Sequence, residues 1–195
     1  MLILASASPR RRELLARVGV VFAVRPADID ESVHAGEAPV AYVERVAATK
    51  AAAIARADAD AWVLAADTSV IVDADILGKA ADDAEAGAML RRLRGRVHQV
   101  TTAVVLRRGA EVHALTVTTD VEFEPCDDHT VAAYVASGEW RGKAGAYAVQ
   151  GIGAALVRGI RGSITNVIGL PLAEVVALLR TTGAAAVSLE RGIAE

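Results

Sequence analysis

Aromatic residues, cysteine and positive charge are all scarce in this 195-residue chain, and each scarcity excludes a class of protein. Aromatic residues make up 4% of the chain, too few for a surface on which the bases of a single-stranded nucleic acid could stack. The formal net charge is −3, whereas a general nucleic-acid binder needs a basic surface. The single cysteine, Cys126, leaves no internal disulfide to form and is typical of the reducing cytoplasm. We therefore expect a cytoplasmic protein with no nucleic-acid partner.

The chain also has no long hydrophobic run. No segment is apolar over the roughly 20 residues that cross a bilayer. Residues 2–5 are too short for a signal peptide, and arginines follow them where they should precede them. Hydrophobic residues still make up 53% of the chain and charged residues 23%, which is a globular composition. We predict no membrane contact, one domain over residues 1–180 and a loose tail over residues 181–195.

Strand-like and helix-like segments alternate along the chain, with one long hairpin in the middle. Period-two and continuous apolar runs predict strands at residues 2–5, 20–24, 62–66, 69–72, 97–106, 111–123 and 154–160. Helical periodicity and capping residues predict helices at residues 9–18, 39–57, 82–93, 127–136 and 173–180, with a loop at 162–172. This order predicts an α/β fold, with a mixed sheet flanked by helices and a central cleft between two lobes.

The segment after the first strand has the composition of an anion site. Small hydroxyl residues and Pro9 form a short loop, and three arginines then occupy the first turn of the predicted helix. Cations at that end oppose the helix dipole, so an anion bound there would stabilise the arrangement. A solvated basic turn capped by a serine explains the same pattern, and the local sequence does not separate the two interpretations.

Two further polar residues stand where apolar ones are expected. Lys50 lies on the apolar stripe of the predicted helix 39–57, so its side chain either extends to solvent or reaches a cleft. Asp67 interrupts a strand-forming run, which is costly unless the carboxylate has a partner. An aspartate that accepts hydrogen bonds from neighbouring backbone N–H groups is the alternative. Asp67 is the strongest local indication of a site.

Familiar nucleotide motifs are incomplete. The segment GEWRGKAG resembles a Walker A loop but is one residue short, and Ala144 stands where a hydroxyl must bind magnesium. Gly151 and Gly153 lack the third glycine of a dinucleotide fingerprint. The four histidines are scattered without metal-ligand spacing.

Five stretches taken together resemble the Maf family of nucleoside triphosphate pyrophosphatases. They are ASASPRRRELL at 5–15, LAADTSV at 64–70, HQVTTAV at 98–104, AGAYAVQG at 144–151 and GSITNVIGLPL at 162–172. The resemblance implies an inosine-triphosphatase-like (Maf/Ham) fold and cleavage of a nucleoside triphosphate to the monophosphate and pyrophosphate. It also implies a divalent metal (Mg²⁺, Mn²⁺ or Co²⁺) and a homodimer. The form of two motifs is similar to the branch that prefers dTTP and UTP.

The resemblance also assigns site residues. It implies a catalytic acid at Asp67, metal ligands at Glu31 and Asp67, and substrate-binding residues at Ser6, Arg10, Arg11, Lys50, Thr68, Lys79 and Gln150. Three positions depart from the family pattern, namely Ala80, Gly142 and Ile164, and the change at 142 removes one charged contact. The amide of a glutamine presents one donor beside one acceptor, so Gln150 can pair with N3–H and a carbonyl of uracil or thymine.

Two other functions fit the same residues. One is a nucleotide-binding regulator of cell division and septum formation that turns over little. The other is a phosphosugar or phosphate-ester enzyme that uses the same anion loop. The presence of Asp67, Lys50 and Lys79 favours the pyrophosphatase, because a regulator that turns over little would be free to lose them.

Overall fold

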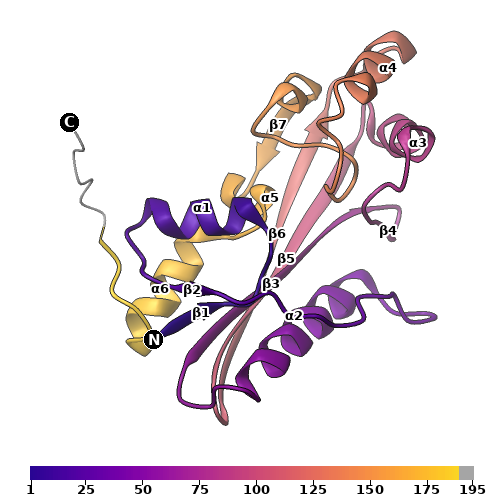
Figure 1. The fold of residues 1–195 in the computed structure, drawn as a ribbon. Helices are drawn as coiled ribbons and strands as arrows, with labels where there is room; N and C mark the ends of the chain where they lie inside the picture. Colours follow the sequence, from indigo (N-terminus) through magenta and orange to yellow (C-terminus); the bar gives the residue numbers. More distant parts are fainter. Residues whose placement is uncertain (189–195) are drawn as a thin grey trace.

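A seven-stranded mixed sheet runs through the whole molecule (Figure 1). The structure is a computed structural model and describes residues 1–188. The strands are β1 (Leu2–Leu4), β2 (Ala23–Val24), β3 (Trp62–Val72), β4 (Asp75–Leu77), β5 (Val97–Arg108), β6 (Glu111–Phe123) and β7 (Val157–Arg161). Their order is β2-β1-β3-β5-β6-β7, with β4 paired to β3; β1 is parallel to both its neighbours and the other pairs are antiparallel.

Helices cover both faces of this sheet. They are α1 (Pro9–Arg17), α2 (Pro39–Ala55), α3 (Asp83–Leu93), α4 (Asp128–Ala136), α5 (Ile164–Ile168) and α6 (Leu172–Thr182), with a 3₁₀ turn, η1, at Ile152–Leu156. The predicted α/β class, with a mixed sheet flanked by helices, is confirmed. None of the helices in residues 1–188 is long and apolar enough to cross a bilayer.

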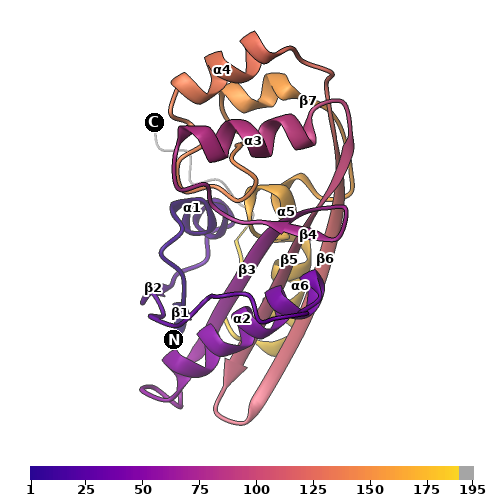
Figure 2. The same cartoon turned by 90° about the vertical axis from the view of Figure 1, so that its right-hand side faces the viewer.

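Strand β3 separates two cores because its side chains alternate between the faces of the sheet. Val63 and Ala65 pack against α2, whereas Leu64 and Ala66 pack against α1 and α6. A third core lies at the other end of the sheet, where α3 and α4 lie next to each other (Figure 2). The sequence suggested two short apolar runs here, but β3 is one continuous strand, and Asp67 lies near its middle.

Two segments differ from the sequence prediction. The run 154–160 begins as the η1 turn, and only its second half is strand, because short alanine-rich apolar runs do not distinguish helix from strand. The segment 162–172 contains α5, which begins where the Ser163 side chain accepts a hydrogen bond from the Asn166 N–H. Its five residues are too few to give a helical period, so its glycines and proline suggested a loop.

The beginning of the segment expected as a tail is ordered against the body of the protein. Helix α6 continues to Thr182, and Gly183 then adopts the left-handed conformation that commonly ends a helix. Ala184 is buried in the core beneath α1 and α6, and the Ser188 N–H donates to the Val18 carbonyl at 3.1 Å. The rest of the predicted tail, 189–195, lies outside the described residues.

Candidate active site

A cavity of about 540 Å³ opens between the half of the molecule that carries α1 and α2 and the half that carries β4 and the loop 142–150. Every residue that the sequence singled out lines it, namely Ser6, Arg10, Arg11, Glu31, Lys50, Asp67, Thr68, Lys79 and Gln150. These residues come from segments that are far apart in the chain. The predicted cleft therefore exists, and the structure brings all nine side chains to it.

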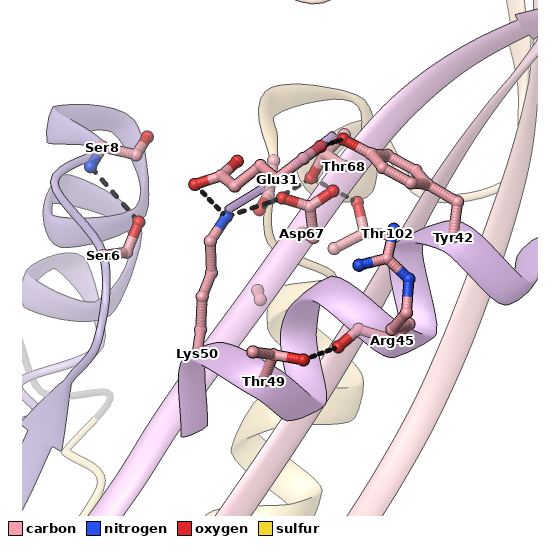
Figure 3. Close-up of polar contacts among 12 residues, drawn as sticks. Ser6, Ser8, Glu31, Tyr42, Arg45, Thr49, Lys50, Asp67, Thr68 and Thr102 are labelled. Atoms are coloured by element: carbon pink, nitrogen blue, oxygen red, sulfur yellow. Dashed lines mark hydrogen bonds and ion pairs between the residues drawn. The ribbon is translucent and has the colours of Figure 1, made fainter. Parts of the chain in front are cut away.

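The Lys50 ammonium lies between two carboxylates in this cavity (Figure 3). Its Nζ is 2.8 Å from Asp67 Oδ1 and 3.0 Å from Glu31 Oε1. Lys50 and Asp67 are each 7% exposed, so this lysine reaches into the cleft and does not extend to solvent. Asp67 has a side-chain cation as its partner, where the alternative interpretation expected backbone N–H groups. Among residues 1–188, the second oxygen of each carboxylate accepts no hydrogen bond.

Residues of α2 that the sequence analysis did not select hold Glu31 in place. The Tyr42 hydroxyl donates to the Glu31 carbonyl at 2.9 Å (Figure 3). Arg45 Nη2 donates to the Ser32 carbonyl at 2.8 Å, and two Arg45 nitrogens contact the Glu37 carboxylate at 2.6 and 2.8 Å. These bonds to Arg45 lower the pKa of Glu37 to about 2. The partners in these contacts are 8 to 13 residues apart, further than one or two helical turns, so no local pattern indicated them.

Arg11 links three segments of the cavity wall. Its Nε donates to the Gly169 carbonyl at 2.8 Å, and its Nη1 donates to the Ala66 carbonyl at 2.7 Å and to Ser6 Oγ at 3.1 Å. Its Nη2 donates to Thr68 Oγ1 at 3.0 Å. Burial lowers the pKa of this guanidinium, and the nearby Asp67 charge partly offsets that effect. Four of its five N–H groups have acceptors within the protein, so only one is left for a ligand.

Arg10 is placed differently. It is half-buried at the first turn of α1, and only its Nε has an acceptor, the Ile168 carbonyl at 3.1 Å. Burial lowers its pKa. The side chain of Ser8, at the N-cap of α1, makes no capping bond. The first N–H groups of a helix have no partner within the helix, so this end of α1 offers both N–H donors and a guanidinium to an anion.

The opposite wall provides two more cations and an amide. Lys79 and Gln150 are exposed, and neither side chain makes a hydrogen bond or ion pair with any residue in 1–188. Lys143 also lines the cavity. Its pKa is lowered mainly by burial and, to a smaller extent, by the nearby charge of Arg10. The sequence analysis gave Lys143 no role; the only signal was its place in the segment KAGAY. The cavity thus has cations on both walls.

Aromatic packing forms the back of the cavity beside these cations. Tyr147 lines the cavity, and its hydroxyl lies 2.8 Å from His98 Nε2. The rings of His98, Phe123 and Tyr147 meet edge to face, with centroids 4.7 to 5.5 Å apart. Burial lowers the pKa of His98 to about 4 and raises the pKa of Tyr147 above its usual value. His98 is therefore neutral at physiological pH and acts as a packed core residue.

The fold and the cavity define a class of protein, an α/β protein with a deep cleft that is lined by cations and encloses a buried lysine–aspartate pair. Comparison with known sequences narrows this class. Residues 1–182 match the family described as Maf-like protein, and the chain belongs to that family. The family resemblance seen in the sequence motifs is thereby confirmed.

Named relatives are similar over nearly their whole length. The dTTP/UTP pyrophosphatase of Myxococcus xanthus is 54% identical, over 94% of this chain and 93% of that protein. The proteins of the same name from Cereibacter sphaeroides and Pelotomaculum thermopropionicum are 51% and 45% identical, over 93% of this chain and 95% and 96% of theirs. Among solved structures, the Staphylococcus aureus Ham1 protein aligns with a TM-score of 0.47 and 18% identity, over 64% of this chain and 72% of that one.

Proposed function

We propose that this protein is a nucleoside triphosphate pyrophosphatase that hydrolyses dTTP and UTP to the monophosphate and pyrophosphate. The observation that carries the proposal is the buried Lys50–Asp67 pair, which lies at the bottom of a cleft with unpaired cations on both walls. Relatives that are 45 to 54% identical and bear the name dTTP/UTP pyrophosphatase support it. Modified pyrimidine nucleotides belong to the same substrate class.

The cations divide into those that bind phosphate and those that hold the site together. Arg10, Lys79 and Lys143 form no ion pair with a carboxylate within residues 1–188, so a triphosphate would supply their counter-charge. Ser6 and Arg11 are already bonded to each other, and Lys50 to two carboxylates. We assign these three residues to the base of the phosphate site, where they orient its walls and contribute fewer direct bonds.

Asp67 has the position of a general base. Its Oδ1 is fixed by Lys50, and Oδ2 has no partner within residues 1–188, so Oδ2 can accept a proton from water. In the proposed step, the oxygen of that water bonds to the α-phosphorus. The bond between this phosphorus and the α–β bridging oxygen breaks, and pyrophosphate leaves with the electron pair. The proton passes to Asp67, and Lys50 keeps the carboxylate oriented.

The acidic residues fit a divalent cation that is shared with the substrate. Glu31 and Asp67 each present one oxygen that Lys50 does not occupy, and residues 1–188 contain no cluster of three or more histidine, cysteine or acidic side chains. Mg²⁺ is commonly held by one or two carboxylates together with substrate phosphates and water. Glu31 would hold such an ion, Mg²⁺, Mn²⁺ or Co²⁺, directly, and Asp67 would hold it through the water that it deprotonates; the ion would neutralise charge on the triphosphate.

Gln150 is the residue that we propose recognises the base of the substrate. Its amide is unpaired within residues 1–188, so it can pair with N3–H and a carbonyl of uracil or thymine. Cytosine offers an unprotonated N3 and an amino group, so it pairs with this amide only if the amide turns over, and discrimination against cytosine requires that the amide be held in one orientation. The Thr68 hydroxyl already accepts from Arg11 and lies 2.9 Å from Thr102 Oγ1. Gln150 therefore carries more of the proposed discrimination than Thr68.

Product analysis tests the function directly. Purified protein is incubated with UTP, and the products are separated by anion-exchange chromatography. We expect UMP and pyrophosphate in equal amounts. UDP and phosphate would reject the pyrophosphatase. Tight UTP binding without turnover, with any divalent metal, would favour the regulator of cell division.

Two further proposals concern the setting of the enzyme. We propose a homodimer, which the family resemblance supports, and sedimentation velocity on the purified chain tests it. We also propose a cytoplasmic location, which the single cysteine supports because no internal disulfide can form. Cell fractionation with an antibody against the protein tests the location.

A further inference from the structure

Gln150 lies on a loop that needs outside support. Residues 148–151 connect the buried Tyr147 to η1, and Gln150 and Gly151 are exposed. An amide discriminates between bases only if it is held within a fraction of an ångström of its pairing position. Gln150 makes no side-chain bond within residues 1–188, so its position depends on how the backbone of the loop is fixed.

Two side chains outside the cavity fix that backbone on both sides of Gln150. The Tyr134 hydroxyl accepts from the Ala148 N–H at 3.2 Å and donates to Glu139 Oε2 at 2.8 Å. Glu139 Oε1 accepts from the Ile152 N–H at 2.8 Å, and Oε2 accepts from the Gly153 N–H at 2.8 Å. We call this set the Tyr134–Glu139 brace. It uses both oxygens of the carboxylate and both functions of the hydroxyl.

The loop packs so closely on the brace that glycine is required at two positions. A Cβ atom at Gly151 would overlap the Glu139 carboxylate. A Cβ atom at Gly153 would lie 2.5 Å from the Ala148 carbonyl oxygen and 2.9 Å from the Tyr134 hydroxyl. The two glycines that looked like a broken dinucleotide fingerprint are therefore explained by close contact with the brace and, at Gly153, with the Ala148 backbone as well.

The brace is itself anchored. Tyr134 is 3% exposed in the core formed by α3, α4 and the end of the sheet. The Trp140 indole N–H, next to Glu139 in sequence, donates to the Val135 carbonyl at 3.2 Å and ties the segment after α4 back to the helix. Neither Tyr134 nor Glu139 lines the cavity. Both can act on a substrate only through the loop.

We propose that Tyr134 and Glu139 are positioning residues that hold the Gln150 loop and thereby set the preference for pyrimidine triphosphates with an N3–H. This inference rests on the proposed function, in which Gln150 reads the base. Loss of the brace would let the loop sample other positions, so the bond to uracil would weaken, while the phosphate-binding cations, none of which is bonded to Tyr134 or Glu139, would remain.

The test compares kcat/KM for UTP with kcat/KM for CTP in Tyr134→Phe and Glu139→Gln. Both variants keep the size of the side chain. Gln150→Ala sets the scale, with an expected fall in the UTP/CTP ratio of about tenfold or more. We expect the two brace variants to lower the ratio by about three- to fivefold, through KM for UTP. Glu122→Gln, an exposed carboxylate-to-amide change that touches neither the loop nor the brace, should keep the wild-type ratio.

A merely structural role would give a different result. Partial unfolding lowers the rates for UTP and CTP by the same factor and leaves their ratio unchanged. Glu139→Gln combined with Gln150→Ala should give the ratio of Gln150→Ala alone, because the brace acts through Gln150. Independent falls that multiply in the double variant would overturn the proposal.

Amide hydrogen exchange separates failure of this inference from failure of the proposed function. In Glu139→Gln, the amides of Ile152 and Gly153 should exchange faster, with no change in β3 and β5. Faster exchange in Glu139→Gln, together with equal kcat/KM for UTP and CTP in the wild type, would reject the assigned base preference and, with it, the link between the brace and specificity. A clear wild-type preference that Gln150→Ala abolishes and both brace variants retain would reject the brace alone.

Discussion

At the scale of single residues, Asp67 shows how a polar side chain in the middle of a strand can mark a site. The residues that precede it in β3 are apolar and buried, and its Oδ1 is bonded to a buried lysine. Asp67→Asn should keep the fold and much of the triphosphate binding but lower kcat by about 100-fold or more, because the amide cannot accept the proton. Single-turnover rates with UTP measure this. A folded variant with near-normal turnover would remove Asp67 from the mechanism.

Arg10 and Arg11 are adjacent in sequence, but their substitution by alanine should have different effects. Arg11→Ala removes four hydrogen bonds in a buried wall and should lower the free energy of unfolding by about 2–4 kcal/mol. Arg10→Ala should change stability little and weaken triphosphate binding, with a penalty that shrinks as salt rises. Urea unfolding and equilibrium titration with a non-hydrolysable UTP analogue at two salt concentrations distinguish them. The same loss of stability in both variants would contradict the division of roles.

The carboxylates at residues 31 and 67 predict a requirement for a divalent cation. Activity should vanish in excess chelator and return with Mg²⁺, Mn²⁺ or Co²⁺. Glu31→Gln should raise the Mg²⁺ concentration needed for half-maximal activity, and Glu44→Gln, a change at an exposed acid of α2 that bonds Thr116 and does not line the cavity, serves as the control. Full activity without metal would contradict the site.

Residue-level prediction from the sequence succeeded where a side chain was out of place in a local pattern. Lys50 on an apolar stripe and Asp67 in a strand were visible because burial of a charge needs a reason. Tyr42, Arg45, Tyr134 and Glu139 were not visible. Each of these residues is of a type that is common at its position in a helix or loop. Its role depends on a hydrogen bond to a backbone group that becomes a neighbour only in the folded protein.

At the scale of elements, the length of each helix or strand decided whether the sequence predicted it correctly. The long hairpin of β5 and β6 and the helix at 82–93 were predicted nearly to the residue, because many periods or clear caps fix them. Helix α5 and the η1 turn were missed because five residues give no period. Yet α5 brings the carbonyls of Ile168 and Gly169 to the two arginines of α1.

Helix α5 is held by one buried asparagine. The Asn166 Nδ2 donates to the Val100 carbonyl at 2.9 Å and to Thr119 Oγ1 at 3.0 Å. Asn166→Ala should cost about 2–3 kcal/mol of unfolding free energy and raise KM for UTP by displacing the arginines. Ser163→Ala, which removes only the cap, should cost about 1 kcal/mol. Thermal unfolding and steady-state kinetics check both, and equal effects would argue against the anchoring role of Asn166.

At the scale of the whole molecule, the sequence predicted the class of fold and a cleft but not the packing that joins its halves. His98 on β5 and Tyr147 after the 142–146 turn meet through a buried hydrogen bond. Burial lowers the pKa of His98 to about 4, whereas an unfolded histidine titrates near 6.5. The unfolded state therefore binds more protons as pH falls from about 6.5 to 4, and the native state loses stability over that range.

This linkage predicts an acid sensitivity that one substitution should reduce. His98 should account for a loss of about 3 kcal/mol in unfolding free energy between pH 7 and pH 4. His98→Gln is expected to be less stable at pH 7 but to lose less stability than the wild type on acidification. His129→Gln, at an exposed position, is the control. Parallel pH profiles for wild type and His98→Gln in urea unfolding would contradict the assignment.

The hydrogen bonds of the Arg11 guanidinium also determine when the phosphate site can form during synthesis of the chain. Its acceptor at Gly169 lies 158 residues further along the chain, which a ribosome reaches about 8–30 s later. During that interval the first strands and α2 can already pair, while Arg11 of α1 can bond the Ala66 carbonyl but not the Gly169 carbonyl. A nascent chain can therefore have most of its sheet and no phosphate pocket. A substrate present in the cell cannot help the early part of this protein to fold, because the pocket that would bind it is incomplete until Gly169 has been made.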